Sequence, residues 1–179
     1  TVTGVNDDLD DGDVVYTILT AAASSADAKY NGINAADVAV TNTDNDAAGI
    51  TVTPTSGLTT TEALGTATFT VVLTSQPTAD VTIGISASDP TEGTVSSPSL
   101  TFTPANWNIA QTVTVTGADD VLDDGNVAYT IVTAAANSAD LIYNGFDAPD
   151  VAVTNTDNDA AGIIIAATSG LTTTDAGVA

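Results

Sequence analysis

Carboxylates are the abundant reactive groups of this chain, and they are concentrated in turns. Among its 179 residues, 23 are Asp or Glu, against a single basic residue, Lys29. Most of the acids are Asp, and many stand beside Gly and Asn in the stretches NDDLDDG, ADDVLDDG and TDND. Four or more carboxylates within about 6 Å of one another repel strongly, so a divalent cation is the natural occupant of a site that they form.

The missing residue types narrow this chemistry further. Because the chain has no Cys, His or Met, disulfides, thiolate chemistry and the usual ligands of zinc, copper and haem are excluded within this sequence. The oxygen ligands that remain suit hard cations, above all calcium. A net charge of −22 repels nucleic acid and anionic lipid, and no run of about 18 apolar residues appears. We therefore expect calcium as the cofactor, no nucleic-acid partner and no direct membrane insertion in this window.

Support for catalysis is weak. The chain has neither His nor Cys to serve as nucleophile or base, and a glycosidase-like carboxylate pair would also need an aromatic-lined cleft. Only one Trp, four Tyr and three Phe are available. The sequence predicts a protein that is not an enzyme.

The chain repeats itself with a displacement of 113 positions. Residues 1–66 return as residues 114–179 without a gap, and about 46 of the 66 pairs are identical. We interpret residues 1–47 as the C-terminal part of a preceding repeat, 48–160 as one complete repeat, and 161–179 as the N-terminal part of the next. Near-identical modules suit a structural or adhesive protein that spans distance.

Threonine alternates with apolar residues in many segments, which is the period of half-buried strands. In residues 66–74, for example, Phe69, Val71 and Leu73 would face inward. The predicted strands are 49–54, 65–74, 79–87, 98–104, 111–118, 125–134 and 149–156. Seven such strands with turns between them predict an all-β fold, a seven-stranded antiparallel β-sandwich of immunoglobulin type in tandem modules.

Candidate ligands follow the ends of these strands. In the complete repeat they are Glu62, Asp89, Asp119, Asp120, Asp123, Asp124, Asp157 and Asp159. Loops after alternate antiparallel strands gather at one end, so the cluster at 119–124 and the pair at 157 and 159 are expected to meet there. Glu92 is expected to be a solvated turn residue. The corresponding candidates in the partial repeats are Asp7, Asp10, Asp11, Asp44, Asp46 and Asp175.

Glu62, the strand LGTATFTVVLT, the segment SLTFTPANWNIAQTVTVTGADDVLDDG and the final TDND together resemble the Calx-beta domain. The resemblance implies a β-sandwich that binds calcium at one end. The matching ligands would be Glu62, Asp89, Asp119, Asp120, Asp123 or Asp124 in place of the family's Glu, Asp157 and Asp159. The chain departs from the family in that substitution and in the longer segment SADLIYNGFDAPDVAV, which resembles repeats of large bacterial surface proteins, including calcium-dependent adhesins.

Within that longer segment, Asp140, Asn144, Asp147 and Asp150 form either a second ion site or a capped Asx-type turn. The function that we expect is a calcium-binding extender in a long secreted or cell-surface bacterial protein, for adhesion or a surface fibre, with neighbouring repeats of the same chain as partners. One alternative is a self-assembling subunit of an extracellular filament or sheath, with like chains as partners. Another is a passive spacer attached to a secreted hydrolase or sugar-binding domain.

Overall fold

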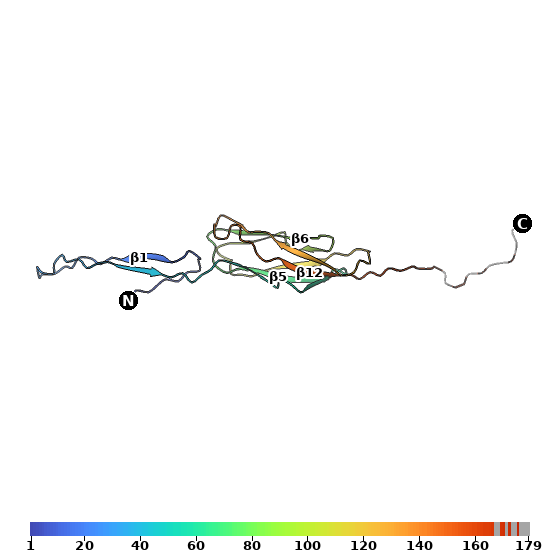
Figure 1. Cartoon of the computed structure of the whole chain (residues 1–179), viewed down its shortest axis with the longest axis horizontal. Coiled ribbons are helices and arrows are strands. Elements are labelled where there is room, and N and C mark those ends of the chain that lie inside the picture. The colour runs from blue at the N-terminus through green and yellow to red at the C-terminus, as the bar shows by residue number, and fades with distance from the viewer. Residues whose placement is uncertain (167–168, 171, 173–174, 176–179) are drawn as a thin grey trace.

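The computed structural model describes residues 1–166, 169–170, 172 and 175. These residues form an N-terminal hairpin, a β-sandwich and an extended C-terminal stretch that follow one another along one axis (Figure 1). The strands of the hairpin are β1 (Val14–Ile18) and β2 (Val38–Asn42). Those of the sandwich are β3 (Ile50–Thr53), β4 (Leu58–Thr61), β5 (Thr66–Leu73), β6 (Val81–Ala87), β7 (Gly93–Val95), β8 (Ser99–Phe102), β9 (Gln111–Gly117), β10 (Val127–Thr133), β11 (Asn137–Ser138) and β12 (Val151–Thr156).

Two sheets make up the sandwich. The larger has the order β11-β6-β10-β12-β4, with β8 also paired to β6, and the smaller has the order β3-β5-β9-β7. All seven strands predicted from the alternation are present, which confirms the all-β sandwich. The strands β4, β7 and β11 were not predicted, because two to four residues are too few to show a period of two. The pair β4–β12 is parallel, unlike the others.

The threonine alternation places the core between the sheets. In β5, Phe69, Val71 and Leu73 are at most 3% exposed, while Thr68 lies on the outer face. The opposing sheet contributes Val81, Ile83, Ile131 and Val151, which are also buried. Burial of this apolar surface, at about 25 cal/mol per Å², drives the two sheets together.

The hairpin shows which features of β10 and β12 two paired strands can form by themselves. Its register, in which Tyr16 is opposite Val40, reproduces the pairing of Tyr129 with Val153 in β10 and β12. The valine of β12 at position 151 is fully buried, but its counterpart Val38 in β2 is 52% exposed. Strand pairing is therefore local to these two strands, whereas burial requires the opposite sheet.

Residues 134–150, which overlap the segment SADLIYNGFDAPDVAV (138–153), lie at the end of the sandwich that faces the hairpin. We call this the entry end. Asp140 Oδ1 accepts a hydrogen bond from Ile142 N at 2.9 Å, and its Oδ2 accepts one from Thr78 N at 2.8 Å. Asp150 and Asn144 likewise accept backbone N–H groups, from Thr133 and Ser138. The structure thus favours the capped turn for this segment.

Within the described residues there is no helix with the length and apolar character needed to cross a membrane.

Candidate metal centre

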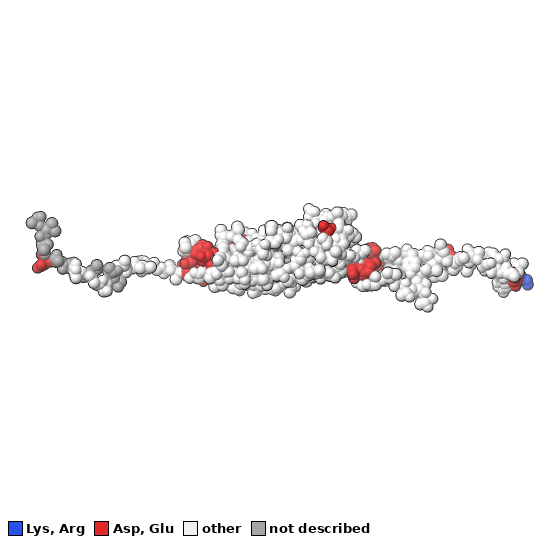
Figure 2. Space-filling view, turned by 180° about the vertical axis from the view of Figure 1, so that it is seen from behind, with Lys and Arg blue, Asp and Glu red and all other residues white. Residues whose placement is uncertain are grey.

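Acidic side chains gather at both ends of the sandwich (Figure 2). The end from which β12 leads into residues 157–166 is called here the exit end. Glu62 follows β4, Glu92 precedes β7, the acids of 119–124 follow β9, and Asp157 and Asp159 follow β12. The antiparallel pairing of β10 with β12 and the parallel pairing of β4 with β12 bring these turns to the exit end.

Glu62, Asp157 and Asp159 form the first cluster, the exit group. Each offers a carboxylate oxygen, and these oxygens lie within 4.8 Å of one another. Asp157 is held by the backbone: its Oδ1 accepts a hydrogen bond from Asp159 N and its Oδ2 one from Gly125 N, both at 2.7 Å. Glu62 is buried, and its Oε2 accepts a hydrogen bond from Asn158 N at 2.9 Å. The group therefore joins the ends of β4 and β12 to the loop after β9.

Asp159 Oδ2 is buried and has no hydrogen-bond partner among the described residues. A buried polar atom without a partner costs about 1–3 kcal/mol, and more when it is charged. Glu62 and Asp157, the other members of the exit group, are themselves acceptors when ionised. A hard divalent cation would satisfy all three oxygens, so this donor set fits calcium.

Glu92, Asp120 and Asp124 form a second cluster, the loop group, whose carboxylate oxygens also lie within 4.8 Å of one another. The expectation that Glu92 is a solvated turn residue is wrong, since it is only 6% exposed. Glu92 lies against the end of β9, where Ala118 N donates a hydrogen bond to Glu92 O at 3.0 Å. One signal in the sequence was available: Glu62 and Glu92 are the only glutamates of the chain, and each belongs to one cluster.

The buried amide of Asn155 supports the loop group. Its Nδ2 lies 3.4 Å from Glu92 Oε2 and donates to Ala118 O at 3.0 Å. Its Oδ1 accepts a hydrogen bond from the Thr60 hydroxyl at 3.0 Å. Sequence reasoning missed both Asn155 and Thr60, which look like ordinary outward strand positions in a threonine-rich chain.

The remaining candidates of the complete repeat have separate roles. Asp119 Oδ1 lies 3.5 Å from Asn158 Nδ2, and Asp123 Oδ2 accepts a hydrogen bond from Ala161 N at 2.7 Å. Both border the exit group. Asp89 lies outside both clusters and caps its own turn, because its Oδ1 accepts hydrogen bonds from Thr91 N and the Thr91 hydroxyl. Asp175, in the C-terminal stretch, is exposed.

The acidic turns of residues 7–48 reproduce the same turn geometry. Gly12 N donates to Asp44 Oδ2 at 2.7 Å, and Asp46 N to Asp44 Oδ1 at 2.8 Å. Ala48 N donates to Asp10 Oδ2 at 2.8 Å, as Ala161 N does to Asp123. A hollow of about 40 Å³ is lined by acids that include Asp7, Asp11, Asp44 and Asp46. The acidic turns thus adopt one arrangement at both ends of the sandwich.

Electrostatics divide the acids into two kinds. Burial, followed by the charges of Asp157, Asp119, Asp120 and Asp123, raises the pKa of Asp159. Backbone hydrogen bonds, first from Asp159 N and then from Gly125 N, lower the pKa of Asp157. Without a bound cation, the fold therefore disfavours the ionised form of Asp159 and stabilises the ionised form of Asp157.

Two further acids show the raised pKa. For Glu62 the hydrogen bond from Asn158 N lowers the pKa, but burial and the charges of Asp157, Asp120 and Asp159 outweigh it. For Asp46 the causes are burial and then the neighbouring aspartates, Asp44 first. Asp44, like Asp157, has a lowered pKa because backbone N–H groups, first that of Asp46, bond to it.

These shifts predict that the effect of pH changes sign with calcium. A carboxyl whose pKa is higher in the folded than in the unfolded chain binds a proton more readily when folded, so acidification through that interval stabilises the fold. In calcium-depleted buffer, the thermal midpoint should rise as the pH falls from 7 towards about 4, and drop below that as Asp157 and Asp44 become protonated. In calcium, protons displace the ion, so the midpoint should fall from pH 7 downward. Thermal scans over this pH range, with and without calcium, check both slopes, and parallel slopes would contradict the ion site.

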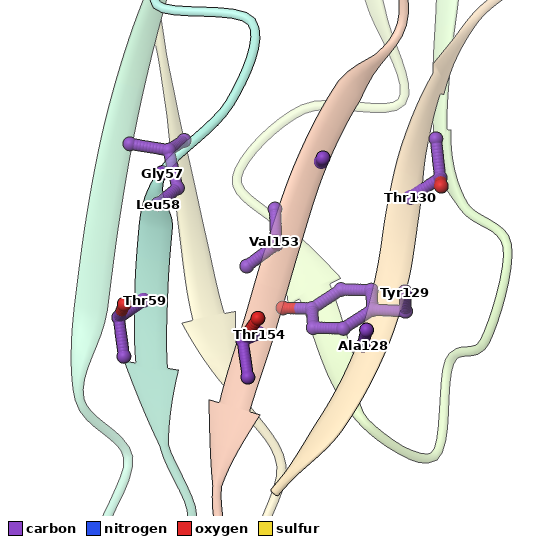
Figure 3. Close-up of a pocket in the computed structure, with 9 residues that line it drawn as sticks. Gly57, Leu58, Thr59, Ala128, Tyr129, Thr130, Val153 and Thr154 are labelled. Atoms are coloured by element: carbon purple, nitrogen blue, oxygen red, sulfur yellow. The ribbon is translucent and has the colours of Figure 1, made fainter.

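A separate hollow of about 280 Å³ lies over β4, β10 and β12 (Figure 3). Its outward side chains are small, such as Thr59, Ala128 and Thr154. Tyr129 also borders it, but its hydroxyl lies 3.3 Å from the buried Thr60 hydroxyl, and burial raises its pKa. None of the clustered carboxylates lines this hollow, so the two features are distinct.

Comparison with known protein families finds no match for the sequence, and no curated protein matches it. Among solved structures, the apo form of the Calx CBD1 domain is similar, with 16% identity and a TM-score of 0.47, over 62% of this chain and 96% of that domain. The periplasmic chaperone SfaE has 13% identity and a TM-score of 0.47, over 66% of this chain and 61% of the chaperone. The CsuC–CsuE chaperone–tip adhesion subunit complex of Acinetobacter baumannii has 10% identity and a TM-score of 0.45, over 62% and 57% of the two chains. With TM-scores below 0.5, these similarities assign the chain to no family and carry no argument about its function.

Proposed function

We propose that the chain is a calcium-binding extender, in which ions at the ends of each sandwich stiffen the joints between successive repeats. The observation that carries this proposal is the buried, unpartnered oxygen of Asp159 beside two further carboxylates. Calcium takes six to eight oxygen ligands in flexible geometry, whereas magnesium demands a near-ideal octahedron. A set of short aspartates on turns therefore favours the larger ion.

The acids of the exit end would have two roles, binding the ion and holding the neighbouring backbone in place. Glu62, Asp157 and Asp159 would hold the ion, and Asp157 would also keep the loop after β9 in place through Gly125. Asp123 fixes the departing chain, because it accepts the hydrogen bond from Ala161 N. The ion supplies positive charge that cancels the repulsion among these acids. Binding would thus tie together three turns and the segment that leads to the next repeat.

The proposed setting is a long secreted or cell-surface protein whose partners are its own neighbouring repeats. Calcium sites in extracellular modules have Kd values of about 10⁻⁴ to 10⁻³ M, which suits a site built from turns. The arrangement of hairpin, sandwich and C-terminal stretch along one axis supports a role in spanning distance (Figure 1). The acid patches at the two ends of the sandwich lie where such repeats would join (Figure 2).

Small-angle X-ray scattering tests the proposed function. We expect the chain to have a larger and more sharply defined maximum dimension in millimolar calcium than in chelator, because mobile joints average over bent shapes. The same titration with magnesium serves as the control for screening of charge. A concentration series separates an extender, whose particle mass stays constant, from a self-assembling subunit, whose mass grows. Identical scattering curves in calcium and chelator would exclude stiffening by calcium.

A further inference from the structure

One acidic loop occurs twice in the chain, in two different surroundings. Residues 5–12 are the sequence counterpart of residues 118–125, which follow β9, and both loops form the same hydrogen bond: Leu9 N donates to Asp7 Oδ1 at 3.0 Å, and Leu122 N to Asp120 Oδ1 at 2.7 Å. Their leucines differ in burial. Leu9 is half-buried, whereas Leu122 is 61% exposed. Because the loops match internally, the difference arises from what lies beside them.

Leu9 lies against the entry end of the sandwich. It shares a hollow of about 140 Å³ with the turn between β5 and β6 and with Ile142 and Tyr143 of residues 134–150. A backbone hydrogen bond accompanies this contact, since Gln76 N donates to Asp8 O at 2.7 Å. The first loop thus meets the sandwich through one backbone hydrogen bond and through Leu9, the apolar side chain of the loop in a hollow that Asp10, Asp11 and Asp140 also line.

The surface that receives Leu9 is held in place from within the sandwich. The buried Tyr143 hydroxyl donates to Ser75 O at 2.7 Å and lies 2.8 Å from the Ser75 hydroxyl, while Ser75 N donates to it at 3.1 Å. Asp140 accepts the hydrogen bond from Thr78 N at the other side of the turn. The Gln76 side chain is anchored as well, because its Nε2 donates to Pro104 O at 2.8 Å. Hydrogen bonds within the sandwich therefore hold residues 75–78 in place, in addition to the bond from Gln76 N to Asp8 O.

We propose that residues 75–78 together with residues 134–150 form a socket for the leucine of the preceding acidic loop, and that this contact joins adjacent repeats without an ion. Residues 134–150 then have a role, since Asp140 and Tyr143 of this segment hold the socket in place. By the same proposal, the Leu122 side chain docks on the entry end of the repeat that follows. The partner of this exposed leucine is therefore the socket of a like repeat in the same chain. The contact is additional to calcium binding and stands whether or not calcium binds.

Hydrogen exchange of the Gln76 amide tests this proposal, because that amide donates to Asp8 O across the joint. The measurement is made by NMR on the full chain in chelator, so that no ion supports the joint. Leu9→Ala is expected to speed exchange of the Gln76 amide by about tenfold or more, since it removes the docked side chain. Leu122→Ala is the matched control, because it makes the same substitution at the equivalent position of the second acidic loop. It should leave the exchange rate of the Gln76 amide unchanged. Slowly exchanging core amides, such as that of Ile83, report that the sandwich stays folded.

The proposal is overturned if Leu9→Ala leaves the Gln76 rate unchanged, or if Leu122→Ala changes it equally. Loss of the calcium response in scattering would leave this result unaffected, so failure of the socket and failure of the ion site are distinguishable.

Discussion

Millimolar calcium is expected to raise the thermal midpoint of unfolding by roughly 5 to 10 °C relative to chelator. An ion that binds only the folded chain, present at about 100 times its Kd, adds about 2.7 kcal/mol to the free energy of unfolding. For chains of about 150–250 residues, each kcal/mol shifts the midpoint by about 2–4 °C. The exit group accounts for one such site, and the pKa values of Asp159 and Glu62 are raised, so a bound cation would favour their ionised forms.

Calorimetric scans in calcium, magnesium and chelator at equal ionic strength measure this effect. Magnesium should give less than half of the shift, because short turn aspartates do not enforce octahedral geometry. A shift that is equal for the two ions would indicate screening of the net charge of −22 instead of a bound ion.

Asp159→Asn is expected to have opposite effects on stability in chelator and in calcium. In chelator the variant should melt above the wild type, because it removes a carboxylate whose pKa is raised by burial and by neighbouring aspartates. Its amide can also donate a hydrogen bond to Glu62 or Asp157, where the wild-type oxygen has no partner. In calcium the variant should melt below the wild type, because it loses an anionic ligand and binds calcium about tenfold more weakly or worse.

Asp147→Asn makes the same change of charge at an exposed position on residues 134–150, outside both acidic clusters, and serves as the control. It should shift melting little and by the same amount in both buffers. Calcium affinity is measured for all three proteins by isothermal titration calorimetry. If Asp159→Asn behaved like Asp147→Asn, the exit group would have no special role.

The sandwich could be predicted because its strands carry a plain physical signal. In β5 and β9, threonine alternates with the side chains of Phe69, Val71, Val113 and Val115, all of which are buried. The gathering of acids at one end follows from antiparallel connections, which place the turns after β9 and β12 together. Neither inference needs a detailed side-chain position.

Which acids share a cluster could not be predicted. Glu92 and Asp89 stand three positions apart in one turn, yet Glu92 is buried beside Asp120 while Asp89 caps Thr91. The outcome depends on how the turn closes over the end of β9, which is a tertiary contact. The parallel pairing of β4 with β12 has the same origin, since Leu58–Thr61 is too short to specify a partner by its own sequence.

The docking of Leu9 in its socket could not be predicted from the sequence, for a different reason. Leu9 and Leu122 occupy identical positions in the repeat, so no pattern distinguishes them. Only the presence of Gln76 and Tyr143 beside one of them makes the difference. A repeated sequence predicts repeated local structure, but contacts between repeats emerge only when two of them are placed together.

The most direct test of the ion site is anomalous X-ray scattering from crystals of the full chain grown with calcium. We expect an anomalous peak within about 2.3–2.6 Å of oxygens from Glu62, Asp157 and Asp159, with Asp159 Oδ2 among the ligands. A fully ordered exit end without such a peak, or with only water beside Asp159, would contradict the account.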